Sequence, residues 1–422
     1  MDNPSMLTQN NSHFQSVLTI ETDFDSRMMQ KCLELARRAL GKTSPNPLVG
    51  AVIVKDGKII GEGFHPRAGE PHAEVFALRA AVENARGATA YVSLEPCNHY
   101  GRTPPCTEAL IAAGVKKVVV GMVDPNPLVA GGGIARLRDA GIEVVVGVEE
   151  TACRKLNEGF VHRIVYQKPL GTLKFAMTLD GKIATNTGHS AWVTSLDARQ
   201  AVYQFRVASD AVVVGGNTVR KDNPYLTSHQ EGANNPLRVV MSRNLDLPTD
   251  AHLWQTEIAQ TLVLTQVGAN PQFQTMLRSR GVEVVEMDVL TPERAMDYFY
   301  QRGFCNVLWE CGGTLAASAI ASGAIQKVLA FIAPKIIGGI NAPTPVGDLG
   351  FTSMTQALSL EDVQISLVGA DCLVEGYLPR KKIKLEIQNQ TYIIIIYLIY
   401  LTFCLLPSYL LPSALFLLPS TS

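Results

Sequence analysis

Short runs of β-branched residues alternate with helix-like segments along most of this chain, and that alternation restricts the fold to the α/β class. The first half contains the strand-like segments AVIVKDGKIIGEG, ATAYVSLEP, KKVVVGMVD and IEVVVGV. In the first of these, Asp56-Gly57 predicts the tight turn of a β-hairpin over Val52 to Ile60. A second series opens at PLGTLKFAMTLDGKIA and does not repeat the first. Such alternation predicts sheets covered by helices, with functional residues where strands end and helices begin. A chain of 422 residues then accommodates two different α/β domains.

The character of the sequence changes at four places, and these set the expected domain boundaries. We expect a disordered leader at 1–24, a first domain at 25–150, a polar helical linker at 151–166, a second domain at 167–380 and an apolar tail at 381–422. The first 26 residues contain no Lys or Arg. They therefore lack the basic start of a secretory signal and the arginines of a transit peptide. We expect a cytoplasmic protein.

The charge balance and the cysteine count narrow the class of partner. The chain carries 37 Lys plus Arg against 38 Asp plus Glu, and 47% of its residues are apolar. A near-neutral protein lacks the broad basic field that holds a nucleic-acid backbone, so a small-molecule substrate is favoured. Eight cysteines without a secretory signal favour free thiols, and a metal site, over a disulfide framework.

The tail has two interpretations. Only 15 residues, Tyr392 to Leu406, precede Pro407, which is short of the roughly 20 that span a bilayer. A membrane anchor with Arg380, Lys381 and Lys382 on its inner side is one interpretation. The other, which we favour, is a translated stretch that does not belong to the folded enzyme.

The first candidate site combines a helix start with two cysteines. PHAEVFALRAA places His72 and Glu74 at the front of a helix-like run, and EPCNHYGRTPPCTEAL supplies Cys97 and Cys106. One imidazole and two thiolates are three zinc ligands, with a fourth position left for water, as in catalytic zinc sites. Glu74 then becomes the proton carrier of a zinc deaminase, in which the glutamate is not a ligand.

Two plainer interpretations stand beside that one. His72 alone is more often a simple helix-start residue, and a structural zinc would use four protein ligands. We expect the remaining cysteines to be core or incidental thiols, and they lie at positions 32, 153, 305, 311, 372 and 404.

The second half gives weaker signals. VVVGGNTV and LWECGGTLAASA each run from a strand into paired glycines. Glycines allow a backbone to approach a phosphate, and a following helix offers free N–H groups. Neither segment is a G-x-G-x-x-G fingerprint, and paired glycines after a strand are also common turns. From these residues alone, dinucleotide binding stays open.

Several motifs together resemble one family over Asp25 to Pro379. HAE, PCNHYGRTPPC and DPNPLVAGGGI resemble the deaminase half, and KFAMTLDGKIAT, SAWVTS, NTVRKDNPYLT and ECGGTLA resemble the reductase half, of the bifunctional RibD family of riboflavin biosynthesis. The resemblance implies an N-terminal cytidine-deaminase-like α/β/α sandwich and a C-terminal dihydrofolate-reductase-like α/β domain. It also implies one Zn²⁺ per chain, NADPH and a homo-oligomer.

The resemblance also implies roles for individual residues. Zinc would be bound by His72, Cys97 and Cys106, with Glu74 as the proton carrier. The pyrimidine and ribose phosphate of the first substrate would be contacted by Asn46, His65, His99, Arg102 and Asn126. The nucleotide cofactor would face Ala176, Trp192, Thr218, Asp222, Gly312, Gly313 and Thr314. The second substrate would face Ser190, Arg206, Leu226, His229 and Glu310.

Purely structural roles remain open for some of these residues. Trp192 could belong to the hydrophobic core, Arg206 could form a surface ion pair, and Glu310 could cap the end of a strand. The chain also departs from the family pattern at two positions. The family often has Lys or Arg where this chain has Gly132, and often has Arg where this chain has His229. The second change predicts weaker or more pH-dependent phosphate binding.

The resulting functional hypothesis is a two-step enzyme. The first domain would hydrolytically deaminate 2,5-diamino-6-ribosylamino-4(3H)-pyrimidinone 5′-phosphate at zinc. The second would then reduce the ribosyl chain with NADPH to give 5-amino-6-ribitylaminouracil 5′-phosphate. The alternatives are an active deaminase with an inactive or weakened reductase, a nucleic-acid or nucleoside deaminase with an unrelated appendage, and a zinc-stabilised binding module without turnover.

Overall fold

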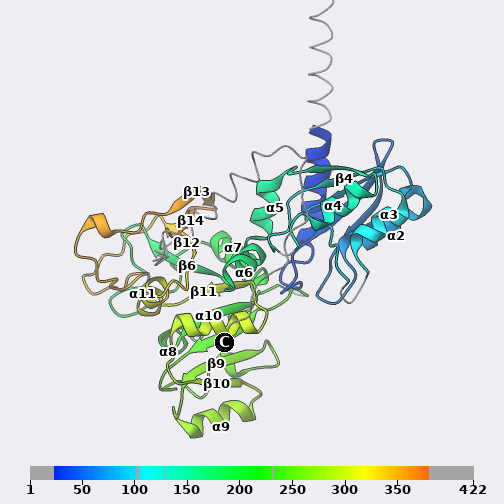
Figure 1. Ribbon diagram of the computed structural model, residues 1–422. Helices are drawn as coiled ribbons and strands as arrows, with labels where there is room; N and C mark the ends of the chain where they lie inside the picture. Colours follow the sequence, from blue (N-terminus) through cyan, green and yellow to red (C-terminus); the bar gives the residue numbers. More distant parts are fainter. Residues whose placement is uncertain (1–22, 101–103, 128, 231, 380–422) are drawn as a thin grey trace, which may run out of the picture. The chain divides into compact units, whose positions relative to one another are not determined.

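The structure is a computed structural model that describes residues 23–100, 104–127, 129–230 and 232–379 (Figure 1). The predictions for the tail at 381–422 and for most of the leader therefore lie outside the described residues. Within the described ranges, no helix has both the length and the apolar character needed to cross a membrane.

The first sheet contains five strands in the order β2-β1-β3-β4-β5. They are β1 (Gly50–Lys55), β2 (Lys58–Phe64), β3 (Thr89–Val92), β4 (Lys117–Val120) and β5 (Glu143–Val146). β1 and β2 form the predicted antiparallel hairpin, and Asp56 and Gly57 at its turn both have positive φ, at 51° and 73°. β1 also pairs antiparallel with β3, whereas β3, β4 and β5 are parallel.

Helices pack closely on this sheet and carry the first site. Residues 23–37 are helical, and α2 (Ala73–Ala81) continues into the 3₁₀ turn η1 (Val82–Ala85). α3 (Cys106–Ala113) lies beside α2, and α4 (Gly132–Asp139) lies beside α3 (Figure 1). A Cβ atom added at Gly63 of β2 would lie 2.3 Å from the carbonyl oxygen of Ala73. The start of α2 therefore rests directly on the sheet.

The second sheet contains nine strands in the order β10-β9-β8-β7-β11-β6-β12-β14-β13. They are β6 (Leu170–Thr178), β7 (Ala211–Gly215), β8 (Leu237–Met241), β9 (Thr261–Gln266), β10 (Glu283–Met287), β11 (Asn306–Trp309), β12 (Lys327–Ala333), β13 (Glu361–Val368) and β14 (Asp371–Tyr377). All neighbours from β10 to β12 are parallel, while β14 and β13 add antiparallel to one side. The apolar runs of β7, β8, β9 and β11 are buried on both faces, as is usual for parallel strands covered by helices.

The helices of this second half connect those strands. They are α5 (Glu150–Leu156), α6 (Glu158–Tyr166), α7 (Leu196–Val207), α8 (Gly216–Asp222), α9 (Pro271–Ser279), α10 (Pro292–Gln301) and α11 (Gly313–Ala321), with short turns η2 (His252–Trp254) and η3 (Met354–Gln356). α8 follows directly on β7, and three residues separate α11 from β11; these two strands are parallel neighbours. Both glycine pairs singled out in the sequence therefore lie at one edge of one sheet.

The cysteines away from the first site follow the prediction of core thiols. The described cysteines are all free, and those at positions 32, 153, 305 and 311 are buried. Cys372 is half-buried, and the prediction for Cys404 lies outside the described residues.

Candidate active sites

The first site brings together three potential metal ligands, two from helix starts and one from a loop. His72 caps the start of α2, Cys97 lies in the loop after β3, and Cys106 is the first residue of α3. His72 Nδ1 lies 3.5 Å from Cys97 Sγ and 3.3 Å from Cys106 Sγ. The backbone N–H of Cys106 donates to Cys97 Sγ at 3.4 Å, which fixes the two sulfurs relative to one another.

These separations fit a tetrahedral zinc ion. Zn–S bonds of about 2.3 Å and Zn–N bonds of about 2.0–2.1 Å at a tetrahedral angle separate nitrogen from sulfur by about 3.6 Å. The three ligand atoms all lie within 4.8 Å of one another, and no fourth His, Cys, Asp or Glu of the described residues joins the group. Three protein ligands are typical of a catalytic zinc site, whereas a structural site normally has four.

Glu74 lies in the first turn of α2, two residues beyond His72, and its side chain is only 3% exposed. Burial, and the negative charge of nearby Cys97, raise the pKa of Glu74 to about 7. Such a carboxyl group both accepts and releases a proton near neutral pH. The two thiols share one proton, because the hydrogen bond from Cys106 lowers the pKa of Cys97 to about 4 while that of Cys106 rises.

Asn46 and His65 form a hydrogen-bonded pair next to this group. The His65 ring packs edge-on against His72 at 5.5 Å between centroids. Its Nδ1 lies 3.0 Å from the carbonyl oxygen of Pro71, which only accepts, so Nδ1 carries the proton and Nε2 accepts from the Asn46 amide at 3.1 Å. His65 is 2% exposed, and burial lowers its pKa. It is thus a neutral ring that orients Asn46.

A buried carboxylate that the sequence analysis missed organises the loop that carries Asn126. Glu95 is 4% exposed and accepts four backbone N–H groups, from Asp124, Gly131, Gly133 and Ile134 at 2.9–3.2 Å. It therefore fixes the loop and the start of α4 together. Its place immediately before Pro96 and Cys97, three residues beyond the end of β3, was the available signal.

The remaining residues predicted for the first substrate differ in how they are placed. Asn126 is half-buried, and its N–H donates to Asp124 Oδ1 at 2.8 Å. His99 is exposed, and Arg102 lies outside the described residues. A Cβ atom at Gly132 would meet nothing within 4 Å, so the structure leaves room there for the longer side chain found in the family.

The second half contains a buried charge cluster around Glu310, which follows β11. Arg206 of α7 pairs with it through two hydrogen bonds, Nε to Oε1 at 2.6 Å and a second nitrogen to Oε2 at 3.2 Å. Lys174 of β6 adds a third contact at 3.4 Å. Burial opposes ionisation, yet Arg206 and Lys174 lower the pKa of Glu310 to about 2. Since Arg206 is only 9% exposed, the interpretation as a surface ion pair is wrong.

The loop after α8 supplies two more of the residues predicted for the second substrate. Leu226 is buried, and Arg206 donates to the neighbouring carbonyl of Thr227 at 2.9 Å. His229 is exposed and packs against Tyr203 of α7 at 4.5 Å between ring centroids. Burial of part of the ring, together with the Arg206 charge, lowers the pKa of His229.

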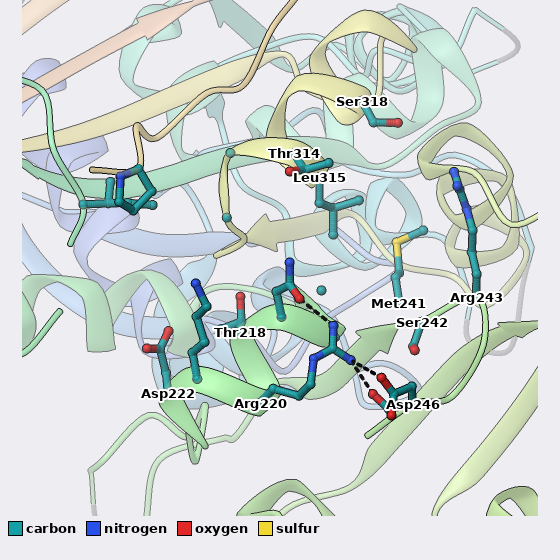
Figure 2. A pocket seen from close by; sticks show the side chains of 18 of the residues that line it. Thr218, Arg220, Asp222, Met241, Ser242, Arg243, Asp246, Thr314, Leu315 and Ser318 are labelled. Carbon is teal, nitrogen blue, oxygen red and sulfur yellow. Dashed lines mark hydrogen bonds and ion pairs between the residues drawn. The ribbon is translucent and has the colours of Figure 1, made fainter. Parts of the chain in front are cut away.

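A cavity of about 710 Å³ at the carboxyl ends of the strands collects most of the residues predicted for the nucleotide (Figure 2). Thr218, Asp222 and the backbone of Gly312 to Thr314 line it, as does Ser190, whose hydroxyl donates to Asp222 at 3.1 Å. A Cβ atom at Gly312 would meet no protein atom within 4 Å. The cavity also contains Ser242 and Arg243, which the sequence analysis missed.

Ala176 and Trp192 are not among the residues that line this cavity. Ala176 packs beside a small cluster that includes Leu329 and Phe331. The Trp192 side chain is 70% exposed, so the interpretation as a core residue is wrong. Arg199 lies over its ring at 4.3 Å, and Lys335 donates to its carbonyl oxygen at 2.9 Å.

Comparisons with known proteins match both halves of the chain. Residues 22–122 match the cytidine and deoxycytidylate deaminase zinc-binding region, and residues 169–374 match the RibD C-terminal domain. The riboflavin biosynthesis protein RibD of Synechocystis sp. is 60% identical over 84% of this chain and 96% of its own length.

Solved structures agree with that result. The structure of Acinetobacter baumannii RibD is 40% identical, superimposes with a TM-score of 0.76, and covers 85% of this chain and 100% of its own. A diaminohydroxyphosphoribosylaminopyrimidine deaminase/5-amino-6-(5-phosphoribosylamino)uracil reductase from Thermotoga maritima is 36% identical, with the same TM-score of 0.76 and the same coverage of 85% and 100%.

Proposed function

Because the chain belongs to the RibD family of riboflavin biosynthesis proteins, we propose a specific role for each of its two sites. It is a bifunctional enzyme, with a deaminase in the N-terminal half and a reductase in the C-terminal half. The first site hydrolyses an amino group from 2,5-diamino-6-ribosylamino-4(3H)-pyrimidinone 5′-phosphate. The second reduces the ribosyl chain of the product to give 5-amino-6-ribitylaminouracil 5′-phosphate.

In the first site, His72, Cys97 and Cys106 would hold one zinc ion, which would supply the lowering of the pKa of water to about 7. Glu74 takes a proton from the attacking water as the C–O bond forms. It then gives the proton to the amino nitrogen as the C–N bond breaks and ammonia leaves. Asn46, which hydrogen-bonds to His65, is assigned to the pyrimidine. Asn126 and His99 are assigned to the pyrimidine and ribose phosphate, as is Arg102, which lies outside the described residues.

The observation that carries the deaminase proposal is a three-ligand group with a buried carboxyl group beside it. A binding module would have no need of Glu74, and a nucleic-acid deaminase would need a basic groove that a net charge of −1 does not favour. The test supplies the diaminopyrimidine phosphate with and without NADPH and identifies the products by mass spectrometry. Deamination should appear in both reactions, and reduction only with NADPH. A substrate that stays intact in both would overturn the proposal.

In the second site, NADPH supplies the hydride, and the protein's task is to bind and orient. Lys174 and Arg206 place two cations around the single carboxylate of Glu310, so the cluster has a net positive charge. That charge suits a substrate with a phosphate. Leu226 and His229 flank it, and the hydrogen bond between Ser190 and Asp222 supports the assignment of adjoining substrate and cofactor subsites to this pair.

The substitution Arg206→Ala tests whether the cluster around Glu310 binds the phosphorylated substrate. Removal of Arg206 leaves Glu310 buried with only the longer Lys174 contact, so NADPH oxidation with the deaminated substrate should fall sharply. Arg302→Ala is the matched control, because Arg302 forms a partly exposed ion pair with Glu283. Equal activity of the two variants would contradict the role of the cluster. The alternative of an inactive reductase is not favoured, because the charge cluster and the cavity are both present in the structure.

We also propose that the enzyme is a homo-oligomer that assembles through β13. This strand is the edge of the nine-stranded sheet, and its alternate side chains Val363, Ile365 and Leu367 are 48%, 70% and 80% exposed. An edge strand with unpaired backbone groups and exposed apolar side chains can pair with another chain, and proteins usually cover or charge such an edge to prevent this. Ile365→Lys with Leu367→Lys should give a monomer by light scattering, whereas a wild-type monomer would refute the idea. A cytoplasmic location stays a prediction from the sequence.

A further inference from the structure

Arg238 is a fully buried cation in the interior of the nine-stranded sheet. It belongs to β8, which lies between β7 and β9, and the residue is 0% exposed. Within the part of the chain that the structure describes, no Asp or Glu forms an ion pair with it. Burial lowers its pKa to about 10, so the guanidinium stays charged at neutral pH. A buried charge without an ionic partner needs hydrogen bonds to satisfy it.

Backbone carbonyl groups take the place of an anion. Arg238 donates to the carbonyl oxygen of Tyr225, in the loop after α8, at 3.4 Å. It also donates to four carbonyl oxygens in the connection between β8 and β9, those of His252, Leu253, Gln255 and Ala259. One nitrogen, Nη1, contacts both Tyr225 and His252, so a single guanidinium joins the two segments. Its Nε has no partner among the described residues, which indicates that the group is placed for these carbonyls and not for the satisfaction of all its own donors.

His252 makes a second link between the same two segments. Its backbone N–H donates to Asn223 Oδ1 at 2.8 Å, and its ring Nδ1 donates to the carbonyl oxygen of Asn223 at 2.8 Å. The ring of Tyr225 stacks on the His252 ring, with 4.0 Å between centroids and 9° between planes. The first residues after α8 are therefore fixed to the connection between β8 and β9 by both backbone and side-chain contacts.

Two buried arginines hold the backbone on either side of Leu226. The carbonyl of Tyr225, the preceding residue, accepts from Arg238. The carbonyl of Thr227, the following residue, accepts from Arg206 at 2.9 Å. Leu226 itself has a φ of 53°, in the left-handed region that residues with a side chain usually avoid. Because both neighbouring carbonyls are held, Leu226 is kept in this conformation with its side chain buried.

We propose that Arg238, together with His252, positions residues 223–229, here called the substrate loop, for the reductase reaction. The loop carries Leu226 and His229, two of the side chains assigned to the phosphorylated substrate. This inference rests on the proposed reductase. Arg238 is too deeply buried to touch a ligand, so it acts through the loop. His229 also has a positive φ, of 50°, and a loop released from its two anchors would relax at both positions and carry both side chains away from the substrate.

The test measures steady-state NADPH oxidation by the full-length protein with the deaminated substrate. In Arg238→Met, which removes the guanidinium, KM for the substrate should rise about tenfold while KM for NADPH changes much less. Arg238→Lys restores a cation and should recover part of the loss. His252→Phe keeps an aromatic ring against Tyr225 but loses the ring's bond to Asn223, so it should raise the same KM by a smaller factor.

Thr261→Val is the matched control. Thr261 is 2% exposed, and its hydroxyl donates at 2.6 Å to the carbonyl of Leu253, which also accepts from Arg238. The variant weakens the connection between β8 and β9 without removing a bond to the substrate loop, so KM for the substrate should stay unchanged. Partial unfolding would lower the apparent kcat through the amount of active enzyme and leave KM as it was. A rise in KM therefore separates positioning from a loss of stability.

An unchanged KM for the substrate in both Arg238→Met and His252→Phe would overturn the inference and leave the reductase proposal standing. An equal rise in Thr261→Val would overturn it as well, since the effect would then belong to the whole connection between β8 and β9. If Arg238→Met does not fold, His252→Phe decides, because it leaves the guanidinium in place. If the wild-type protein does not oxidise NADPH with the deaminated substrate, both proposals are overturned.

Discussion

Replacement of Glu74 by glutamine removes the proposed proton carrier of the first site and keeps nearly the same side-chain volume. Glu74 is 3% exposed in the first turn of α2, so bulk water does not reach the position to replace it. Loss of a positioned acid–base group costs about a hundred- to ten-thousandfold in rate, or about 2.7–5.4 kcal/mol in the activation barrier. Because the side chain is buried, we expect the upper part of that range.

The assay measures deamination, zinc content and reduction separately. Zinc content should stay at one per chain, because Glu74 is not among the three grouped ligands. Reduction of substrate supplied already deaminated should also be unchanged. Glu108→Gln is the matched control, because Glu108 forms a half-exposed ion pair with Arg136 at 2.8 Å, and it should deaminate at nearly the wild-type rate.

Two results would refute this reasoning. If Glu74→Gln deaminates at the wild-type rate, the proton is carried by another group. If it loses its zinc along with its activity, Glu74 maintains the metal site and the rate loss says nothing about proton transfer.

Three further predictions follow from the same contacts. Cys97→Ser should lose zinc, measured by elemental analysis, whereas Cys372→Ser should retain it, because Cys372 lies outside the ligand group. The pKa of His229 is lowered, so the ring gains its positive charge only at acid pH. The KM for the phosphorylated substrate should therefore fall as the pH drops. His229→Arg should lower this KM at neutral pH and remove its dependence on pH. Gly63→Ala puts a Cβ atom 2.3 Å from a carbonyl oxygen of α2 and should destabilise the protein by about 1–3 kcal/mol in chemical unfolding, whereas Gly132→Ala, with open space, should cost nothing measurable.

Local patterns in the sequence predicted the elements well because each pattern reports on its own segment. The β1–β2 hairpin followed from Asp56-Gly57, and the start of α2 followed from the apolar run after His72. The order of the strands in the nine-stranded sheet was not predictable in this way. It depends on which buried faces pack together after the chain has passed through several crossovers.

The sequence by itself determined the chemical groups of the first site, since the spacing of His72, Cys97 and Cys106 already indicated three zinc ligands with Glu74 beside them. Only the tertiary structure decided that Arg206 meets Glu310 across 104 residues of chain and that Lys174 joins them. It alone also revealed Glu95 as the acceptor of four N–H groups and placed Arg243 in the lining of the cavity. The physical reason is that residue spacing constrains neighbours along the chain, whereas contacts between distant segments depend on sheet order and helix packing.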